Sequence, residues 1–123
     1  MAGDPVTDIP FRVEPVATPG DAPLEYGQAD RGRVRLTVRA GERRTGGYRI
    51  AVAGLSRSGP VLTVRCEIHE PEGGAIVSQV LTFPAQTVSV DEALVRGVRH
   101  AVLVDRSGAE LARLSAQDLT HLT

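Results

Sequence analysis

The chain has 123 residues, a formal net charge of −1 and a 41% hydrophobic content. This length suits a single domain whose core needs neither disulfide nor metal. The near-neutral charge argues against nucleic acid or an anionic membrane as the partner. No run of 18 apolar residues and no charged start followed by an apolar stretch is present, so we expect no transmembrane segment and no signal peptide within this chain.

Residues 1–32 are rich in Pro, Gly and Asp and are predicted to form an N-terminal segment. Residues 11–16 are a candidate edge strand, because Pro15 cannot donate a backbone hydrogen bond in a central strand. Residues 18–23 are predicted to be a loop, and Tyr26 is predicted to anchor the chain that follows.

The strand signal becomes clear at Arg33. Apolar Val34, Leu36 and Val38 alternate with polar residues, which is the period of a strand with one buried face. Further strands are predicted at 48–53, 62–69, 76–83, 87–90, 99–105 and 110–114, with Gly/Pro-containing turns at 56–60, 70–74 and 106–109. Residues 91–97 are ambiguous and suit a helix, and Ser115 with Asp118 resembles a helix-capping pair.

Short strands at intervals of about 8–12 residues, separated by turns, are typical of sandwiches and small barrels. We therefore predict a single all-β domain, an antiparallel β-sandwich or small barrel. The expected organisation is an N-terminal segment at 1–32 with a candidate edge strand, the sandwich at 33–114, and a C-terminal tail at 115–123 with a candidate helical turn.

One pair of residues has a spacing that could bind a metal ion. Glu67 and His69 lie two residues apart on one strand face, so both could reach one ion, with His100 as the candidate third ligand. The simpler interpretation is a polar strand end that faces solvent, and we predict no metal site. His121 is expected in a frayed tail.

The single cysteine, Cys66, alternates with Leu62, Val64 and Ile68 and is predicted to be buried. Burial in apolar surroundings raises the pKa of a thiol and makes it unreactive. No Gly-x-Ser-x-Gly elbow activates a serine. The sequence therefore predicts no catalytic residue, no cofactor and no enzymatic activity.

Three arginines, Arg33, Arg35 and Arg39, share the polar face of one predicted strand. A spacing of roughly 7 Å between alternate side chains approximates that of phosphates, and β-barrels bind single-stranded nucleic acid in this way. Such sites also need aromatic side chains for stacking, which are nearly missing here. We therefore predict a solvated, salt-bridged face with Glu42 or Glu67 as partners, and no nucleic acid.

The stretch AGERRTGGYRI, residues 40–50, places irregular, arginine-rich backbone between two well-patterned strands. It is either a plain turn, with the two glycines at most a weak anion-binding nest, or a recognition loop at a hairpin tip held by a rigid sheet. Glycine permits positive φ, and Thr and Tyr can fix the loop base. The candidate partner-binding residues are Arg43, Arg44, Thr45, Gly46, Gly47 and Tyr48.

Residues 41–55, GERRTGGYRIAVAGL, together with residues 61–90, resemble the C-terminal domain of PrcB-like protease-complex subunits. Those domains contain a Gly-x-x-(Pro/Arg)-Thr-Gly-Gly-Tyr turn between strands, an acidic Pro-Gly turn, and a strand that ends in Thr-x-Pro. Arg44 stands where proline is frequent in the family. The matching positions are Gly41, Thr45, Gly46, Gly47, Tyr48, Pro71, Gly73, Gly74, Gln79, Thr82 and Pro84.

The resemblance implies a non-catalytic β-domain of bacterial envelope or secreted proteins. The namesake subunit associates with and stabilises a subtilisin-like surface protease, so the resemblance implies a protein partner, with a secreted protease as the candidate, and an extracytoplasmic location. We therefore expect a protein-binding module of a protease complex.

Two alternatives remain. Residues 44–48 also resemble, more distantly, the Thr-Thr-Gly-Phe/Tyr loop of chagasin-type cysteine-protease inhibitors, although the chain has no tryptophan for their Arg-Pro-Trp loop. The other alternative is a structural or assembly domain without a dedicated ligand, which could form a homo-oligomer through an exposed sheet edge.

Overall fold

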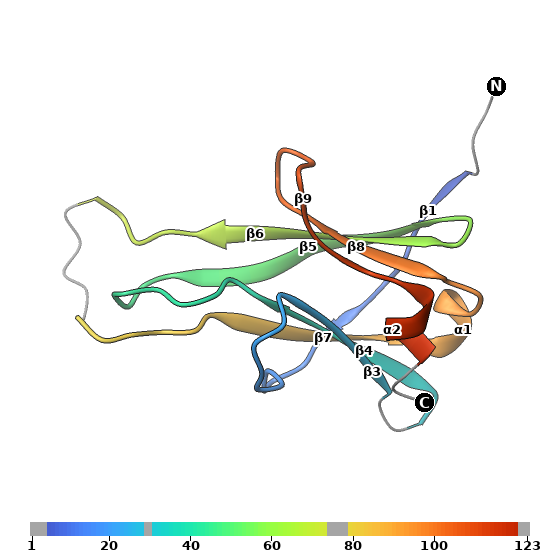
Figure 1. The fold of residues 1–123 in the computed structure, drawn as a ribbon, viewed down its shortest axis with the longest axis horizontal. Helices are drawn as coiled ribbons and strands as arrows, with labels where there is room; N and C mark the ends of the chain where they lie inside the picture. The colour runs from blue at the N-terminus through green and yellow to red at the C-terminus, as the bar shows by residue number, and fades with distance from the viewer. Residues whose placement is uncertain (1–4, 29–30, 74–78, 121–123) are drawn as a thin grey trace.

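Two sheets pack face to face in the computed structural model, which describes residues 5–28, 31–73 and 79–120 (Figure 1). The first sheet has five strands in the order β1-β5-β6-β8-β9, and the second has four in the order β2-β7-β4-β3. The all-β sandwich is confirmed. The strands are β1 (Val6–Asp8), β2 (Arg12–Val13), β3 (Leu24–Gln28), β4 (Arg33–Arg39), β5 (Arg49–Ser58), β6 (Val61–His69), β7 (Ala85–Asp91), β8 (His100–Val104) and β9 (Glu110–Leu114).

Strand neighbours are antiparallel except for β6 and β8, which run parallel. The chain leaves β6 for β7 in the opposite sheet and then returns beside β6, so β8 enters in the same direction as β6. A parallel pair needs such a crossover connection. The periodicity of the sequence carries no information on this crossing.

Two short helices occur at the positions where the sequence suggested them. Helix α1 (Glu92–Val95) follows β7, and the Asp91 carboxylate accepts a hydrogen bond from the Ala93 amide at 2.9 Å. Helix α2 (Ala116–Thr120) begins after Ser115, whose amide donates to Asp118 Oδ2 at 2.8 Å. This bond is half of a capping box. Among the described residues, no helix is long and apolar enough to span a membrane.

Several strand predictions differ from the structure, and residues 56–58, predicted to be part of a turn, belong to β5. β3 lies within residues 1–32, where the sequence predicted only a candidate edge strand at 11–16, yet it pairs with β4 along its whole length. The strand predicted at 76–83 is wrong for residues 79–83, which make only an isolated bridge at Thr82, and residues 76–78 lie outside the described residues. Apolar residues there resemble a strand pattern, but three of them are exposed and none packs in the core.

The core lies between the inner faces of the two sheets. Val34, Leu36 and Val38 of β4 are at most 2% exposed, as the period of two predicts. Full burial of one such side chain contributes roughly 1.5–3 kcal/mol, so these faces supply most of the driving force for folding. The buried cluster consists of Ile9, Leu24, Val34, Leu36, Val38, Ile50, Val52, Leu55, Leu62, Val64, Cys66, Val88, Val90, Val95, Ala101, Leu103 and Leu119.

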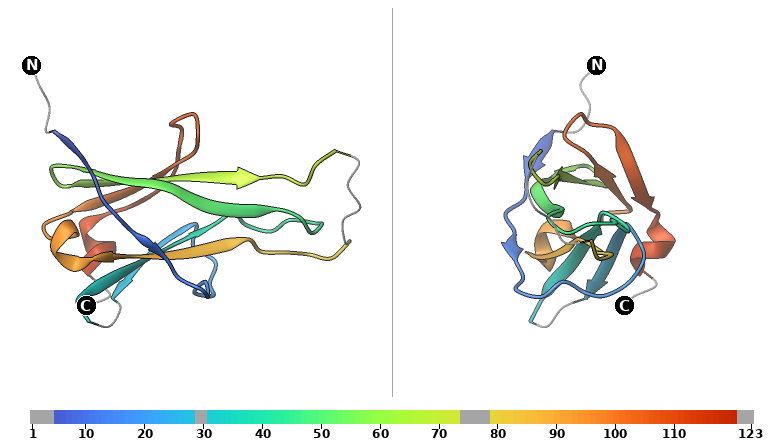
Figure 2. Two further views of the ribbon diagram at one scale, coloured as in Figure 1. Left: turned by 180° about the vertical axis from the view of Figure 1, so that it is seen from behind. Right: turned by 90° about the vertical axis from the view of Figure 1, so that its left-hand side faces the viewer.

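The outer face of the second sheet is also covered, because the N-terminal segment crosses from the first sheet to the second and then runs over it (Figure 2). The Glu14 amide donates to the Thr87 carbonyl at 2.8 Å, and the Thr18 amide donates to Thr87 Oγ1 at 2.9 Å. Thr87 Oγ1 also lies 2.7 Å from Thr37 Oγ1. The segment is therefore hydrogen-bonded to β7, and Thr37 and Thr87 are buried.

Arg39 holds the part of the N-terminal segment that lies over the sheet, residues 14–23, which we call the covering segment. Its guanidinium donates to the carbonyl oxygens of Ala22 and Thr18 and to Glu25 Oε1, each at 2.7 Å, and its side chain is 7% exposed. Gly20 lies against it so closely that a Cβ there would come within 2.7 Å of Nη2. A charged donor that satisfies three acceptors in a nearly buried site stabilises the loop it binds.

The prediction that the arginines of β4 form a solvated, salt-bridged face is therefore wrong, because part of that face is covered. Arg39 is buried and pairs with Glu25 instead of Glu42 or Glu67. Arg33 donates to the hydroxyl and carbonyl oxygens of Ser89, and Arg35 is exposed. Alternation identified the outer face of β4, but it could not show that residues 14–23 lie over that face.

Replacement of Arg39 by methionine should lower the free energy of unfolding by about 2–3 kcal/mol, since two backbone carbonyls and a carboxylate lose their donor. Arg35→Met on the same strand is the matched control and should change stability by less than about 0.5 kcal/mol. Urea unfolding measures both, and limited proteolysis should show cleavage between residues 14 and 23 only in the Arg39 variant. Equal stability of the two variants would contradict this role.

Candidate functional site

The loop predicted to bind a partner connects the two sheets, because β4 lies in the second sheet and β5 in the first. It is therefore not the tip of a hairpin, as the sequence suggested. Alternating strands on both sides of a short loop do not reveal whether the strands pair with each other. The loop and the chain that leads into β7 lie together at one end of the molecule's long axis (Figure 1).

Backbone hydrogen bonds join these two segments. The Arg43 amide donates to the Thr82 carbonyl and the Thr82 amide donates to the Arg43 carbonyl, both at 2.8 Å. Thr82 Oγ1 also donates to the Thr45 carbonyl at 3.0 Å. The loop is thus attached to the segment before β7 by three hydrogen bonds that continue the pairing between β4 and β7.

The six candidate residues have different environments. The Arg43 guanidinium carbon lies 5.3 Å from the centre of the Tyr48 ring, and both side chains are half-buried. Gly47 takes a φ of 90°, which favours glycine, whereas Thr45 and Gly46 are partly covered. Arg44 is exposed. The structure therefore places Arg43 and Tyr48 in contact inside the loop and leaves the Arg44 side chain available at its surface.

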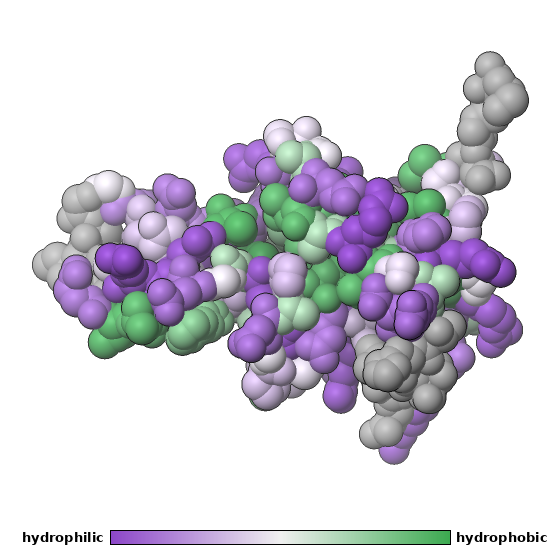
Figure 3. Space-filling view, in the orientation of Figure 1, coloured by the Kyte–Doolittle hydropathy of each residue, from purple (hydrophilic) through white to green (hydrophobic). Residues whose placement is uncertain are grey.

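Three large apolar side chains next to the loop are exposed, and sequence reasoning did not select them. Val80 is 58%, Leu81 57% and Phe83 67% exposed. Figure 3 shows apolar surface along the segment that leads into β7. The sequence predicts a strand for this run, and no pattern in it marks these side chains as exposed. We call residues 41–48 and 79–84 together the distal surface.

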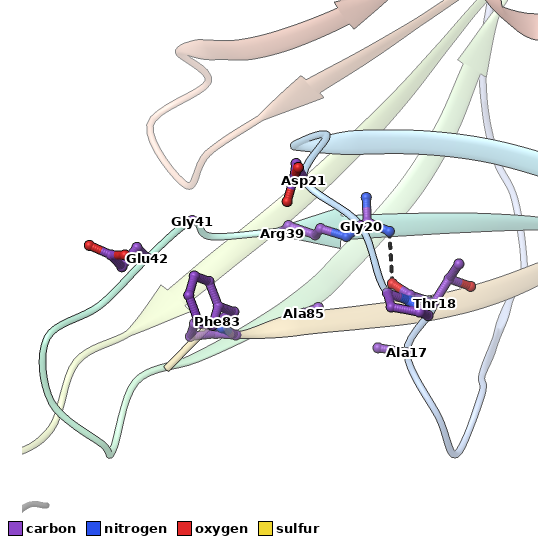
Figure 4. Close-up of a pocket in the computed structure, with 11 residues that line it drawn as sticks. Ala17, Thr18, Gly20, Asp21, Arg39, Gly41, Glu42, Phe83 and Ala85 are labelled. Carbon is purple, nitrogen blue, oxygen red and sulfur yellow. Dashed lines mark hydrogen bonds between the residues drawn. The ribbon is translucent and has the colours of Figure 1, made fainter. Parts of the chain in front are cut away.

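A pocket of about 560 Å³ opens beside the distal surface. Its walls come from the covering segment at residues 17–21, from residues 39, 41 and 42, and from residues 83–85 (Figure 4). The Arg39 hydrogen bond to Thr18 forms its inner wall, and the Phe83 ring stands at its outer side. Three segments that are distant in the sequence thus form one concavity.

Of the three residues considered for metal binding, Glu67 and His69 lie close together, but His100 does not join them. His69 Nε2 and Glu67 Oε2 are 3.6 Å apart, and Arg106 lies 3.6 Å from the other Glu67 oxygen. His100 pairs with Val61 at the opposite end of β6, so it cannot be the third ligand. In the described ranges, no group of three or more His, Cys, Asp or Glu side chains could hold a metal ion. His121 lies outside the described residues.

Cys66 is buried in the core with 1% of its surface exposed, as predicted. Burial raises the pKa of its thiol, and the nearby negative charge of Asp105 raises it further. The pKa of the Asp105 carboxyl is itself lowered, chiefly because it accepts a hydrogen bond from the Ser107 hydroxyl. A buried thiol with a raised pKa is a poor nucleophile.

The raised thiol pKa predicts a pH dependence of stability. The unfolded chain loses the Cys66 proton near the ordinary value of 9.0, at a lower pH than the folded chain. The corresponding stability is complete below that value and decreases as the pH rises through the folded-state pKa. Between about pH 8 and pH 10.5, wild type should therefore lose more unfolding free energy than Cys66→Ala. A constant difference between the two proteins would contradict the prediction.

The contact between Arg43 and Tyr48 should be measurable as a coupling energy. Tyr48→Leu should remove it and Tyr48→Phe should keep it, because the cation interacts with the ring face. A double-mutant cycle with Arg43→Met should give about 0.5–1 kcal/mol of coupling for the leucine variant. A coupling indistinguishable from zero would show that the two side chains do not interact in solution.

Comparison with known proteins supports the resemblance seen in the sequence. Residues 36–91 match the family model described as PrcB C-terminal. The match begins within β4 and ends with β7, so it spans the loop, the distal surface and strands from both sheets. No curated protein and no solved structure matched the chain. Residues 36–91, slightly less than half of the chain, are therefore similar to the PrcB C-terminal family.

Proposed function

We propose that this domain is a non-catalytic protein-binding module whose distal surface contacts an extracytoplasmic subtilisin-like protease and stabilises it. The observation that carries the proposal is the exposure of Val80, Leu81 and Phe83 on a segment fixed by backbone hydrogen bonds. Clustered exposed apolar side chains mark interaction sites in soluble proteins. Because the segment is already held in place, little conformational entropy is lost on binding.

Arg44 complements this apolar cluster. It is the exposed arginine of the loop, whereas Arg43 lies against Tyr48. Arginine is enriched among residues that dominate binding energy, together with aromatic residues such as Phe83 near the centre of an interface. A partner surface with a carboxylate next to an apolar depression would fit both features.

A binding role also suits the titratable groups. The Cys66 thiol is buried and its pKa is raised, which disfavours a nucleophile. The Glu67 carboxylate lies between His69 and Arg106 near a partly exposed strand end. The family match supports the proposed role in a protease complex, and the same resemblance is the reason for proposing an extracytoplasmic location.

The experiment measures binding to purified subtilisin-like and papain-like proteases by biolayer interferometry. Leu81→Ser/Phe83→Ser should weaken binding to the subtilisin-like partner by at least about tenfold, since apolar anchors at an interface centre often contribute 1–2 kcal/mol or more each. Arg43→Ala/Arg44→Ala/Thr45→Ala tests the loop in the same way. Val6→Ser/Leu111→Ser, which changes two exposed apolar residues of the other sheet, is the control.

Protease activity and thermal inactivation separate the proposal from its alternatives. A stabilising subunit should lengthen the half-life of the protease without blocking peptide hydrolysis. Loss of activity at stoichiometric amounts would favour a chagasin-like inhibitor instead. Unchanged binding of both distal-surface variants would eliminate the proposed surface. A concentration-dependent dimer in light scattering, lost in the same variants, would favour an assembly domain.

A further inference from the structure

We propose that the pocket beside the distal surface receives an arginine side chain of the partner protein. This inference rests on the proposed function, since the pocket shares Phe83, Gly41 and Glu42 with the distal surface. It adds the chemistry that the partner must present there. The pocket has an acidic rim, a partly apolar wall and an internal cation that is already neutralised, and each feature favours a planar cationic group.

The charge of the pocket is the first argument. Asp21 and Glu42 are lining residues with exposed carboxylates, and neither forms an ion pair within the described part of the chain. In Figure 4, Asp21 extends from the covering segment toward the opening, and Glu42 lies at the outer rim. The lining residues carry two carboxylates, those of Asp21 and Glu42, and one guanidinium, that of Arg39, which is already paired with Glu25, so the charge of the lining is negative.

Arg39 does not attract an anion into this pocket. Its terminal nitrogens already donate to Ala22, Thr18 and Glu25, and its side chain is 7% exposed. Arg39 Nε has no hydrogen-bond partner among the described residues but is buried, so an incoming phosphate or carboxylate could not reach it from solvent without rearrangement and would approach two further carboxylates. Repulsion between like charges in a partly desolvated site disfavours that arrangement.

The apolar wall selects a planar cation. Phe83 is 67% exposed, and its ring stands at the opening next to Pro84 and Ala85. A guanidinium can stack on an aromatic face while its N–H groups donate to carboxylates, whereas an ammonium is a compact and strongly hydrated charge. The volume of about 560 Å³ is ample for one such side chain and leaves space for the flanking backbone.

The test uses the isolated chain and three acetylated, amidated peptides, Ala-Arg-Ala, Ala-citrulline-Ala and Ala-Glu-Ala, titrated in NMR spectra. Citrulline keeps the shape of arginine without its charge. The arginine peptide should bind with a Kd on the order of 1 mM and shift the amides of Asp21, Glu42 and Ala85. The citrulline peptide should bind at least about fivefold more weakly, and the glutamate peptide should not saturate.

Variants of the lining residues test whether the arginine peptide binds in this pocket. Asp21→Asn and Glu42→Gln should each weaken the arginine peptide by about threefold and together by about tenfold. Phe83→Leu should weaken it by about threefold. Asp8→Asn, which removes an exposed carboxylate on the edge of the other sheet, should have no effect. Equal binding of arginine and citrulline, preference for glutamate, or unchanged binding by the double variant would overturn the inference.

The peptide titration tests the pocket separately from the proposed protease binding, because no protease is present in it. Arginine-peptide binding without capture of a subtilisin-like protease would leave the pocket assigned and the proposed partner rejected. If the arginine peptide does not bind, but the Asp21→Asn/Glu42→Gln variant still captures the protease, the distal surface is supported and the pocket is rejected.

Discussion

Pairing between β4 and β7 is the constraint on which both the core and the distal surface depend. The register runs from Arg33 opposite Asp91 to Arg39 opposite Ala85, and it continues through the Ala40 amide, which donates to the Pro84 carbonyl at 3.0 Å. The bridge between Arg43 and Thr82 extends it further. Hydrogen bonds between these two segments, in the strand ladder and in the isolated bridge beyond it, therefore join the buried strands to an exposed loop. A rigid scaffold of this kind is what positions a binding loop.

The covering segment packs over β4 and β7 on the face opposite the other sheet. Strands β4 and β7 are covered by the other sheet on one face and in part by residues 14–23 on the opposite face, where Arg39 and the Thr37–Thr87 contact provide the polar bonds. The same segment forms one wall of the pocket. The N-terminal residues thus contribute to the stability of the fold and to the shape of the pocket beside the distal surface. The family match begins only at residue 36, so this wall lies outside the matched region.

Much of the sandwich could be predicted from the sequence because its strands follow a strict period of two. Strand β9 and the Ser115–Asp118 cap are found where the sequence places them, since both depend on local rules. The parallel pairing of β6 with β8, the pairing of β3 and the covering of Arg39 could not be predicted, because they depend on contacts between distant segments. The loop at residues 43–48 was identified by composition and resemblance, whereas the exposed Phe83 was mistaken for part of a strand.

The central claim is that the distal surface is preorganised before any partner binds. Amide hydrogen exchange measured by NMR on the free protein tests it most directly, because it reports the opening of individual hydrogen bonds. The account predicts that the amides of Arg43 and Thr82 exchange at least about 100-fold more slowly than those of an unstructured peptide. Exchange of both amides at the unstructured rate, with β4 and β7 still protected, would show that the loop and the segment before β7 separate freely and would contradict the account.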